Sequence, residues 1–126
     1  MDDQNMPAPV DGAIVHIEIY AEDLQEARKF YGGCFGWTFK EWGDTSNYVL
    51  FMDAAGKLGG GFTKESNTGA GGILLYIYCI DLDAKIKQVD AAGGRILEGR
   101  TPIPGVGFFA TFVDPFGNHI GLFTAQ

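Results

Sequence analysis

The chain is poor in basic residues. Lysine and arginine together number 9 in 126 residues, against 16 aspartates and glutamates, so the formal net charge is −7. Nucleic acids and anionic membrane surfaces are bound through basic patches, and this charge balance argues against both as partners. We therefore expect no nucleic-acid partner and no membrane partner.

Cysteine and long apolar segments are also scarce. The two cysteines, Cys34 and Cys79, are too few for a disulfide scaffold, and no apolar run approaches the roughly 18 residues of a membrane span. The first residues, MDDQNMPAPVDG, are acidic and contain proline, the opposite of the basic and then apolar start of a signal peptide. These features predict a cytoplasmic protein in which residues 1–12 form a flexible tail ahead of a single domain over residues 13–126.

An internal repeat is the most informative feature of the chain. HIEIYAEDLQEARKF, which starts at His16, matches LYIYCIDLDAKIKQV, which starts at Leu74; in both, an alternating strand-like segment leads to Asp-Leu and then to a helical pattern. Three more strand-like segments follow each helical pattern, at 37–42, 48–52 and 58–63 and again at 95–98, 108–113 and 119–124. The repeat predicts an α+β domain made of two βαβββ modules, at about 13–65 and 72–126.

Capping residues predict where the helices begin and end. Asp23 is expected to cap the first helix, with Glu26 completing a capping box, and Gly32-Gly33 to end it in a left-handed turn. The second helix is predicted over residues 81–92. The stretch TPIPGVG, residues 101–107, is predicted as a long irregular loop that could cover the mouth of a pocket.

The strands that open the two modules alternate between an apolar face and a mixed face. We expect the apolar faces to meet the helices; they carry Val15, Ile17, Ile19, Ile73, Leu75, Ile77 and Cys79. The mixed faces are left to line a cavity; they carry His16, Glu18, Tyr20, Leu74, Tyr76 and Tyr78. The tyrosines could contact a small ligand or only fill space, because a phenol ring combines apolar area with a polar end.

Several stretches together resemble the vicinal oxygen chelate superfamily, which includes glyoxalase I, bleomycin-resistance proteins, extradiol dioxygenases and fosfomycin-resistance enzymes. The stretches are VHIEIYAEDLQEARKFYGGCFGW, GGGF, CIDLDAKIKQVDAAGG and FVDPFGNHIGLF. The chain looks closest to the single-domain branch of predicted relatives of lactoylglutathione lyase, and the resemblance extends from Ile14 to Thr124. It implies two βαβββ modules that curl into a cup with the helices outside, often assembled as a homodimer.

The resemblance also implies where a metal would be held. Metal-dependent members place four ligands in the cup, and the corresponding positions here are His16, Leu74, Gly60 or Gly61, and Gly121. Leucine and glycine side chains offer no donor atom, whereas divalent metals need three or four nitrogen and oxygen donors. We therefore expect no metal cofactor. If nickel or zinc is bound, the alternative ligands are His16 with Glu18 or His119.

The candidate ligand-binding residues come from both modules. They are His16, Glu18, Tyr20, Leu74, Tyr76, Tyr78, His119 and Phe123. His16 could be a metal ligand, a general base or a hydrogen-bonded histidine, and Glu18 could be a catalytic base or a structural partner of a nearby polar group. No catalytic residue beyond these two is indicated.

Three functions remain open from the sequence. The first is a protein that binds a small molecule in an apolar, tyrosine-lined cup with a degenerate metal site. The second is a metal-dependent glyoxalase-like lyase or isomerase that acts on a vicinal-oxygen substrate. The third is an interaction module whose surface is its function. Residue types alone leave open whether the chain is an enzyme.

Overall fold

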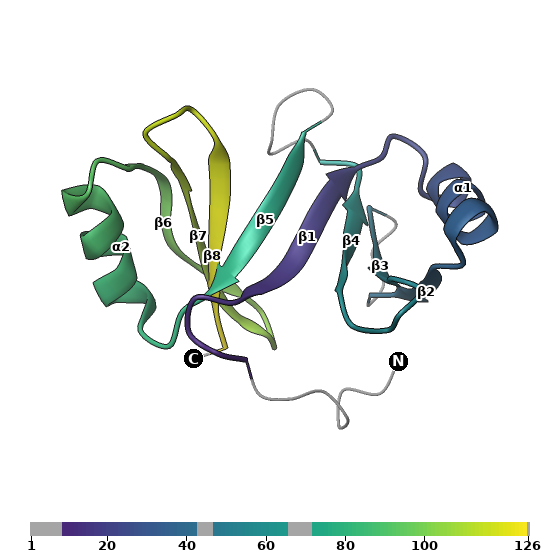
Figure 1. Cartoon of the computed structure of the whole chain (residues 1–126), viewed down its shortest axis with the longest axis horizontal. Coiled ribbons are helices and arrows are strands. Elements are labelled where there is room, and N and C mark those ends of the chain that lie inside the picture. Colours follow the sequence, from purple (N-terminus) through teal and green to yellow (C-terminus); the bar gives the residue numbers. More distant parts are fainter. Residues whose placement is uncertain (1–8, 43–46, 66–71, 126) are drawn as a thin grey trace. The chain divides into compact units, whose positions relative to one another are not determined.

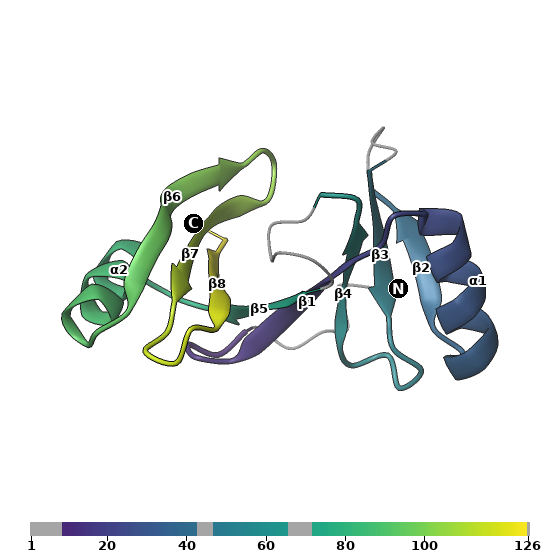
Figure 2. The ribbon, with the colours of Figure 1, turned by 90° about the horizontal axis from the view of Figure 1, so that it is seen from above.

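The computed structural model describes residues 9–42, 47–65 and 72–125, and the chain divides into two compact units (Figure 1). The first unit is built on Val15–Leu74, and the second on Ala8–Ile14 with Leu75–Gln126. In each unit one helix covers one face of its own sheet (Figure 2). No helix among the described residues is long and apolar enough to cross a membrane.

The first unit contains four strands and one helix. They are β1 (Ile14–Tyr20), α1 (Leu24–Phe35), β2 (Thr38–Glu41), β3 (Tyr48–Met52) and β4 (Gly59–Thr63). The strand order is β2-β3-β4-β1. β1 runs parallel to β4, and the other two pairings are antiparallel.

The second unit repeats this arrangement. Its elements are β5 (Ile73–Tyr78), α2 (Leu82–Ala91), β6 (Arg95–Ile103), β7 (Gly107–Val113) and β8 (His119–Thr124). The strand order is β5-β8-β7-β6, with β5 parallel to β8 and the other pairs antiparallel. The predicted α+β class and the βαβββ repeat are therefore confirmed. The closure of both sheets into one cup stays a prediction.

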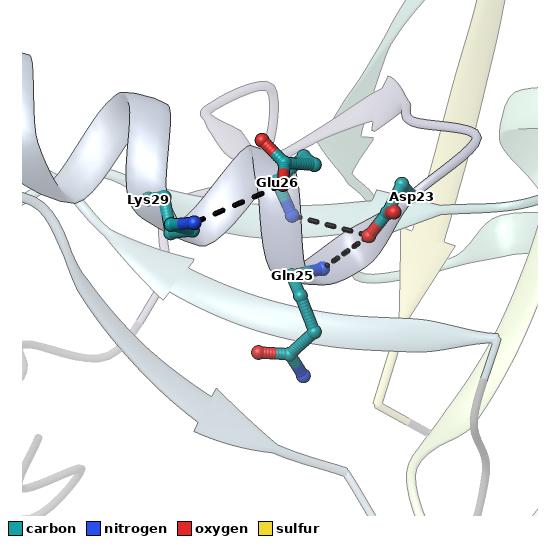
Figure 3. Close-up of polar contacts among 4 residues, drawn as sticks. All are labelled: Asp23, Gln25, Glu26 and Lys29. Atoms are coloured by element: carbon teal, nitrogen blue, oxygen red, sulfur yellow. Dashed lines mark hydrogen bonds and ion pairs between the residues drawn. The ribbon is translucent and has the colours of Figure 1, made fainter.

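Helix α1 begins where the capping pattern predicts (Figure 3). The Asp23 carboxylate accepts the N–H groups of Gln25 at 3.0 Å and Glu26 at 3.1 Å, which satisfies two amides that have no partner within the helix. The Glu26 carboxylate lies 3.9 Å from the Lys29 ammonium one turn later. Asp81 caps α2 in the same way by accepting the N–H of Ala84 at 3.0 Å.

The predicted end of α1 at Gly32-Gly33 is wrong. The helix continues through both glycines to Phe35, and the left-handed cap is Gly36, whose φ is 71°. A Cβ on Gly32 would lie 3.2 Å from the Phe39 ring. The glycine at that position therefore serves the close approach of α1 to the sheet rather than a turn.

The predicted irregular loop over residues 101–107 is also wrong. β6 continues to Ile103 and β7 begins at Gly107, so residues 104–106 form a tight turn in which the Val106 N–H donates to the Ile103 carbonyl at 2.9 Å. Pro102 is tolerated because β6 is the outer strand of the unit, where a missing N–H need not break the ladder. This segment is a hairpin and not an irregular loop.

Each unit packs its core between its helix and one face of its sheet. The core of the first unit is Leu24, Ala27, Val49, Phe51 and Phe62, with Ile17, Ile19, Ala21, Tyr31, Trp37 and Phe39 packed against it. The core of the second is Cys79, Leu82, Ala110 and Leu122, with Ile77, Ile86, Val89, Phe108 and Phe112 packed against it. The prediction that the apolar strand faces meet the helices holds for Ile17, Ile19, Ile77 and Cys79.

The described residues before β1 belong to the second unit and are hydrogen-bonded within it. The Asp11 carboxylate accepts the Ile80 N–H at 2.9 Å, and the Gly12 N–H donates to the Tyr78 carbonyl at 2.8 Å. Residues 1–8 of the predicted flexible tail lie outside the described residues.

Candidate functional site

Alternation along the strands places His16 and Glu18 on the sheet face of the first unit that is opposite α1. Their neighbours Ile17 and Ile19 pack into the core beneath the helix, and successive residues of a strand point to opposite faces. Glu18 pairs with Gly61 across the parallel β1–β4 ladder, so Gly61 shares that face. We call it the triad face, after the three polar residues described below.

The ring of Tyr48 fills the space above Gly61. A Cβ on Gly61 would overlap the Cε1, Cζ and hydroxyl of Tyr48, so only glycine leaves room for the ring in this position. Gly60 points the other way, since its Cβ would overlap the Ile17 carbonyl oxygen and lie 2.8 Å from the Phe51 ring in the core. Of the two glycines that the sequence left open, Gly61 is the one on the triad face.

The second unit contains an equivalent pair. Gly121 on β8 is the register partner of Tyr76 on β5, and a Cβ on Gly121 would lie 2.5 Å from the Tyr76 ring. Each of the two glycines at the donor positions implied by the resemblance is therefore covered by a tyrosine ring. An aromatic ring beside a glycine in a sheet restores the apolar contact that the missing side chain would have made.

The Tyr48 hydroxyl joins His16 to Glu18. It donates to Glu18 Oε2 at 3.0 Å and lies 2.7 Å from His16 Nε2. A tyrosine hydroxyl has one proton, and because that proton goes to Glu18, the hydroxyl accepts from His16 Nε2–H. His16, Tyr48 and Glu18 thus form a polar triad. The Tyr48 ring is nearly parallel to the His16 ring and meets the Trp42 ring edge-on at a centroid distance of 5.3 Å.

Burial perturbs both ends of the polar triad. Loss of solvent lowers the pKa of His16 from 6.5 to about 4, so the imidazole is neutral at pH 7. Burial raises the pKa of Glu18; the hydrogen bond from Tyr48 opposes this rise, and the nearby Glu65 carboxylate adds to it. Both shifts keep the half-buried side chains of His16 and Glu18 uncharged over a wider pH range than in water.

Acid is expected to destabilise the protein through His16. Because its folded pKa is depressed, its contribution to folding is complete above pH 6.5 and is lost as the pH falls toward about 4. Between pH 7 and pH 5 the loss is up to about 2 kcal/mol of unfolding free energy. Glu18 acts in the opposite direction, since a raised folded pKa favours folding at low pH and that contribution is lost as the pH rises through it.

Urea denaturation of the wild type and His16→Gln at pH 7 and pH 5 measures this effect. The acid-induced loss should be smaller in His16→Gln by about 2 kcal/mol, because only the His16 contribution is removed. His119→Gln is the matched control, since His119 is exposed on β8, and it should keep the wild-type loss. An equal loss in the wild type and His16→Gln would contradict a buried, neutral His16.

The structure distributes the predicted ligand-binding residues over both units. The first unit brings His16 and Glu18 together on β1, with the half-buried Tyr20 at its end. In the second unit Tyr76 covers Gly121, and Tyr78 lies beside Phe123 at a ring-centroid distance of 6.4 Å. The other two predicted residues are Leu74, which is buried, and His119, which is exposed. The joining of the two groups into one site stays a prediction.

Sequence reasoning missed Tyr48. It was expected only as the first residue of a strand, yet it is the residue that connects the two polar candidates. The signal that would have found it is Gly61. A glycine in the middle of a strand leaves a hole on one face, and a large ring on a neighbouring strand is the usual way to fill it.

The residues present do not fit a four-donor metal site. Of the four positions implied by the resemblance, only His16 carries a donor; Leu74 is a buried hydrocarbon, and tyrosine rings cover Gly61 and Gly121. Within either unit, no three histidine, cysteine, aspartate or glutamate side chains gather among the described residues. The alternative ligands His16 and Glu18 are held apart by the Tyr48 hydroxyl between them.

Comparisons with known proteins agree with this fold. The model of the glyoxalase/bleomycin resistance protein/dioxygenase superfamily matches residues 13–122. A glyoxylase-like domain-containing protein from Didymella fabae is 32% identical over 114 residues, which cover 85% of this chain and 89% of that protein.

Two solved structures show the same fold at low sequence identity. Methylmalonyl-CoA epimerase from Mycobacterium tuberculosis is 18% identical with a TM-score of 0.68, covering 99% of this chain and 96% of that chain. A member of the superfamily from Vibrio splendidus is 15% identical with a TM-score of 0.67, covering 91% and 99%.

Proposed function

We propose that this chain, which belongs to the glyoxalase/bleomycin resistance protein/dioxygenase superfamily, binds a small molecule on the triad face of its first unit without the help of a metal. The polar triad of His16, Tyr48 and Glu18 would orient the ligand, and the rings of Tyr48 and Trp42 would supply apolar contact. The pocket that we expect is tyrosine-lined and mostly apolar, with few polar groups.

The observation that carries the proposal is the burial of the polar triad on a sheet face. Taking an imidazole and a carboxylate out of water is unfavourable unless they are paired, and here both are held by one hydroxyl. A purely structural role would be met as well by apolar side chains of similar size. Perturbed titratable groups concentrated in one place are typical of binding and catalytic sites.

The metal-dependent lyase or isomerase that the resemblance also implies is not favoured by any contact among the described residues. A metal on the triad face would need a second and third donor beside His16, and the Tyr48 hydroxyl lies between His16 and Glu18 instead. A bound ligand would therefore meet hydrogen-bonding groups and rings rather than a Lewis acid. Proton transfer by Glu18 to or from such a ligand remains compatible with this arrangement.

A fragment screen by two-dimensional NMR tests the proposal. Fragments that bind should shift the amide of Gly61 and its strand neighbours, and Tyr48→Phe should weaken them at least about fivefold because it removes both hydrogen bonds of the triad. Tyr31→Phe is the matched control: it makes the same chemical change on the helix side of the same sheet and should leave affinity unchanged. Absence of any fragment on the triad face, or equal affinity in Tyr48→Phe, would leave an interaction module as the better reading.

A further inference from the structure

We infer that the triad face selects a ligand that carries a cationic nitrogen with N–H donors, such as a primary amine or an amidine, and rejects oxyanions. The inference rests on the proposed function, because it names the ligand class for the same site. It follows from which carboxylate oxygen of Glu18 is already used and from where the protons of His16 and Tyr48 go.

Glu18 has one oxygen in use and one available. Oε2 accepts from the Tyr48 hydroxyl, and among the described residues no donor reaches Oε1. Among the described residues, no side-chain oxygen or nitrogen is both enclosed and without a hydrogen-bond partner. Because Oε1 has no such partner, it must be reachable by solvent. A carboxylate oxygen that water can reach is open to a donor from a ligand, and a charged donor makes the stronger bond.

The donors of the polar triad are used within it. The Tyr48 proton goes to Glu18, and the His16 Nε2 proton goes to the Tyr48 hydroxyl. An oxyanion needs donors from the protein; neither of these protons can serve it without breaking a bond of the triad. The atom of Glu18 that remains for a ligand, Oε1, is an acceptor.

The charges around Glu18 also favour a cationic ligand. Burial raises the Glu18 pKa, the hydrogen bond from Tyr48 opposes this rise, and the nearby carboxylate of Glu65 adds to it. Lys40 shares the triad face, since its partner Leu50 pairs with Gly61, but it is exposed on the outer strand β2. An arriving cation would relieve the repulsion between Glu18 and Glu65, whereas an anion would add to it.

The aromatic side chains suit a cation with an apolar body. The Tyr48 ring lies against the strand above Gly61, and the Trp42 ring meets it edge-on, with 39% of the Trp42 residue exposed. Cations bind favourably against the faces of tryptophan and tyrosine rings. An arylalkylamine combines the two kinds of contact that Glu18 and these rings offer.

Three probes that share a phenyl ring test the inference: benzylamine, benzyl alcohol and benzoate, each titrated by two-dimensional NMR. In the wild type we expect benzylamine to bind the triad face at least about tenfold more tightly than benzoate, as one charge-assisted hydrogen bond would give. Glu18→Gln should abolish that preference. Glu98→Gln is the matched control, because Glu98 is a carboxylate of the second unit that accepts from the Thr111 hydroxyl at 3.3 Å; it should keep the preference.

The outcomes separate the two claims. If benzoate or benzyl alcohol binds the triad face as well as benzylamine does, or if Glu18→Gln keeps the preference for the amine, the inferred ligand class is wrong while the binding site stands. If none of the three shifts the amide of Gly61 at millimolar concentration, the inferred ligand class is overturned; the proposed function is overturned as well when no fragment of the wider screen binds the triad face.

Discussion

Gly60→Ala is expected to lose at least about 3 kcal/mol of unfolding free energy, the largest effect of any single substitution considered for this protein. The added Cβ would overlap the carbonyl oxygen of Ile17 in the adjacent parallel strand and lie 2.8 Å from the Phe51 ring. A backbone carbonyl cannot rotate away as a side chain can. β1 and β4 would have to separate at the centre of the first unit, where Gly60 is the register partner of Ile17.

Urea denaturation followed by circular dichroism measures this loss. Gly99→Ala is the matched control, since Gly99 lies in the outer strand β6 and a Cβ there would have no described atom within 4 Å. Its unfolding free energy should stay within about 0.5 kcal/mol of the wild type. A similar stability for Gly60→Ala and Gly99→Ala would show that β1 and β4 are not in the register described here.

Gly61→Ala should break both hydrogen bonds of the polar triad. Its Cβ would overlap the end of the Tyr48 ring, and because the ring is rigid it must leave the sheet and take its hydroxyl away from His16 and Glu18. We expect a loss of about 2–3 kcal/mol for two broken hydrogen bonds, one of them to an acidic side chain, together with loss of fragment binding on the triad face. Urea denaturation and the NMR titration measure the two effects.

Gly121→Ala separates the loss of stability from the loss of fragment binding. Its Cβ would lie 2.5 Å from Cδ1 of Tyr76, so a tyrosine ring must move there as well, but in the second unit and away from the polar triad. Gly121→Ala should therefore destabilise the protein while fragments still bind the triad face. If both variants lose binding equally, the tyrosine-covered glycines matter for folding alone and the site is not the triad face.

The fold was largely predictable because its signals are local or repeated. The offset between the segments at His16 and Leu74 predicts two equal modules, and Asp23 and Asp81 mark the helix starts through bonds to amides two or three residues away. Alternation along β1 predicts which residues meet α1. The caps and the alternation depend on neighbours within one turn or one strand, and the repeat is a match between two segments; a sequence displays both directly.

The predictions that were wrong depend on contacts that the local sequence pattern does not display. Gly32 could be read as a helix stop because nothing in the sequence shows that Phe39 packs against it. TPIPGVG could be read as a loop because strand pairing between β6 and β7 was needed to show a hairpin. Tyr48 was missed because its partners are 30 and 32 residues away. Assembly as a homodimer and a cytoplasmic location stay predictions.

The central claim is that a tyrosine hydroxyl, and not a metal, joins His16 to Glu18. Long-range ¹H–¹⁵N correlation spectra test it directly, because the chain has two histidines and the exposed His119 serves as the reference. At pH 7 we predict a neutral His16 with its proton on Nε2, unchanged when one equivalent of zinc is added. A proton on Nδ1, or a shift of the His16 nitrogens with stoichiometric zinc, would contradict the account.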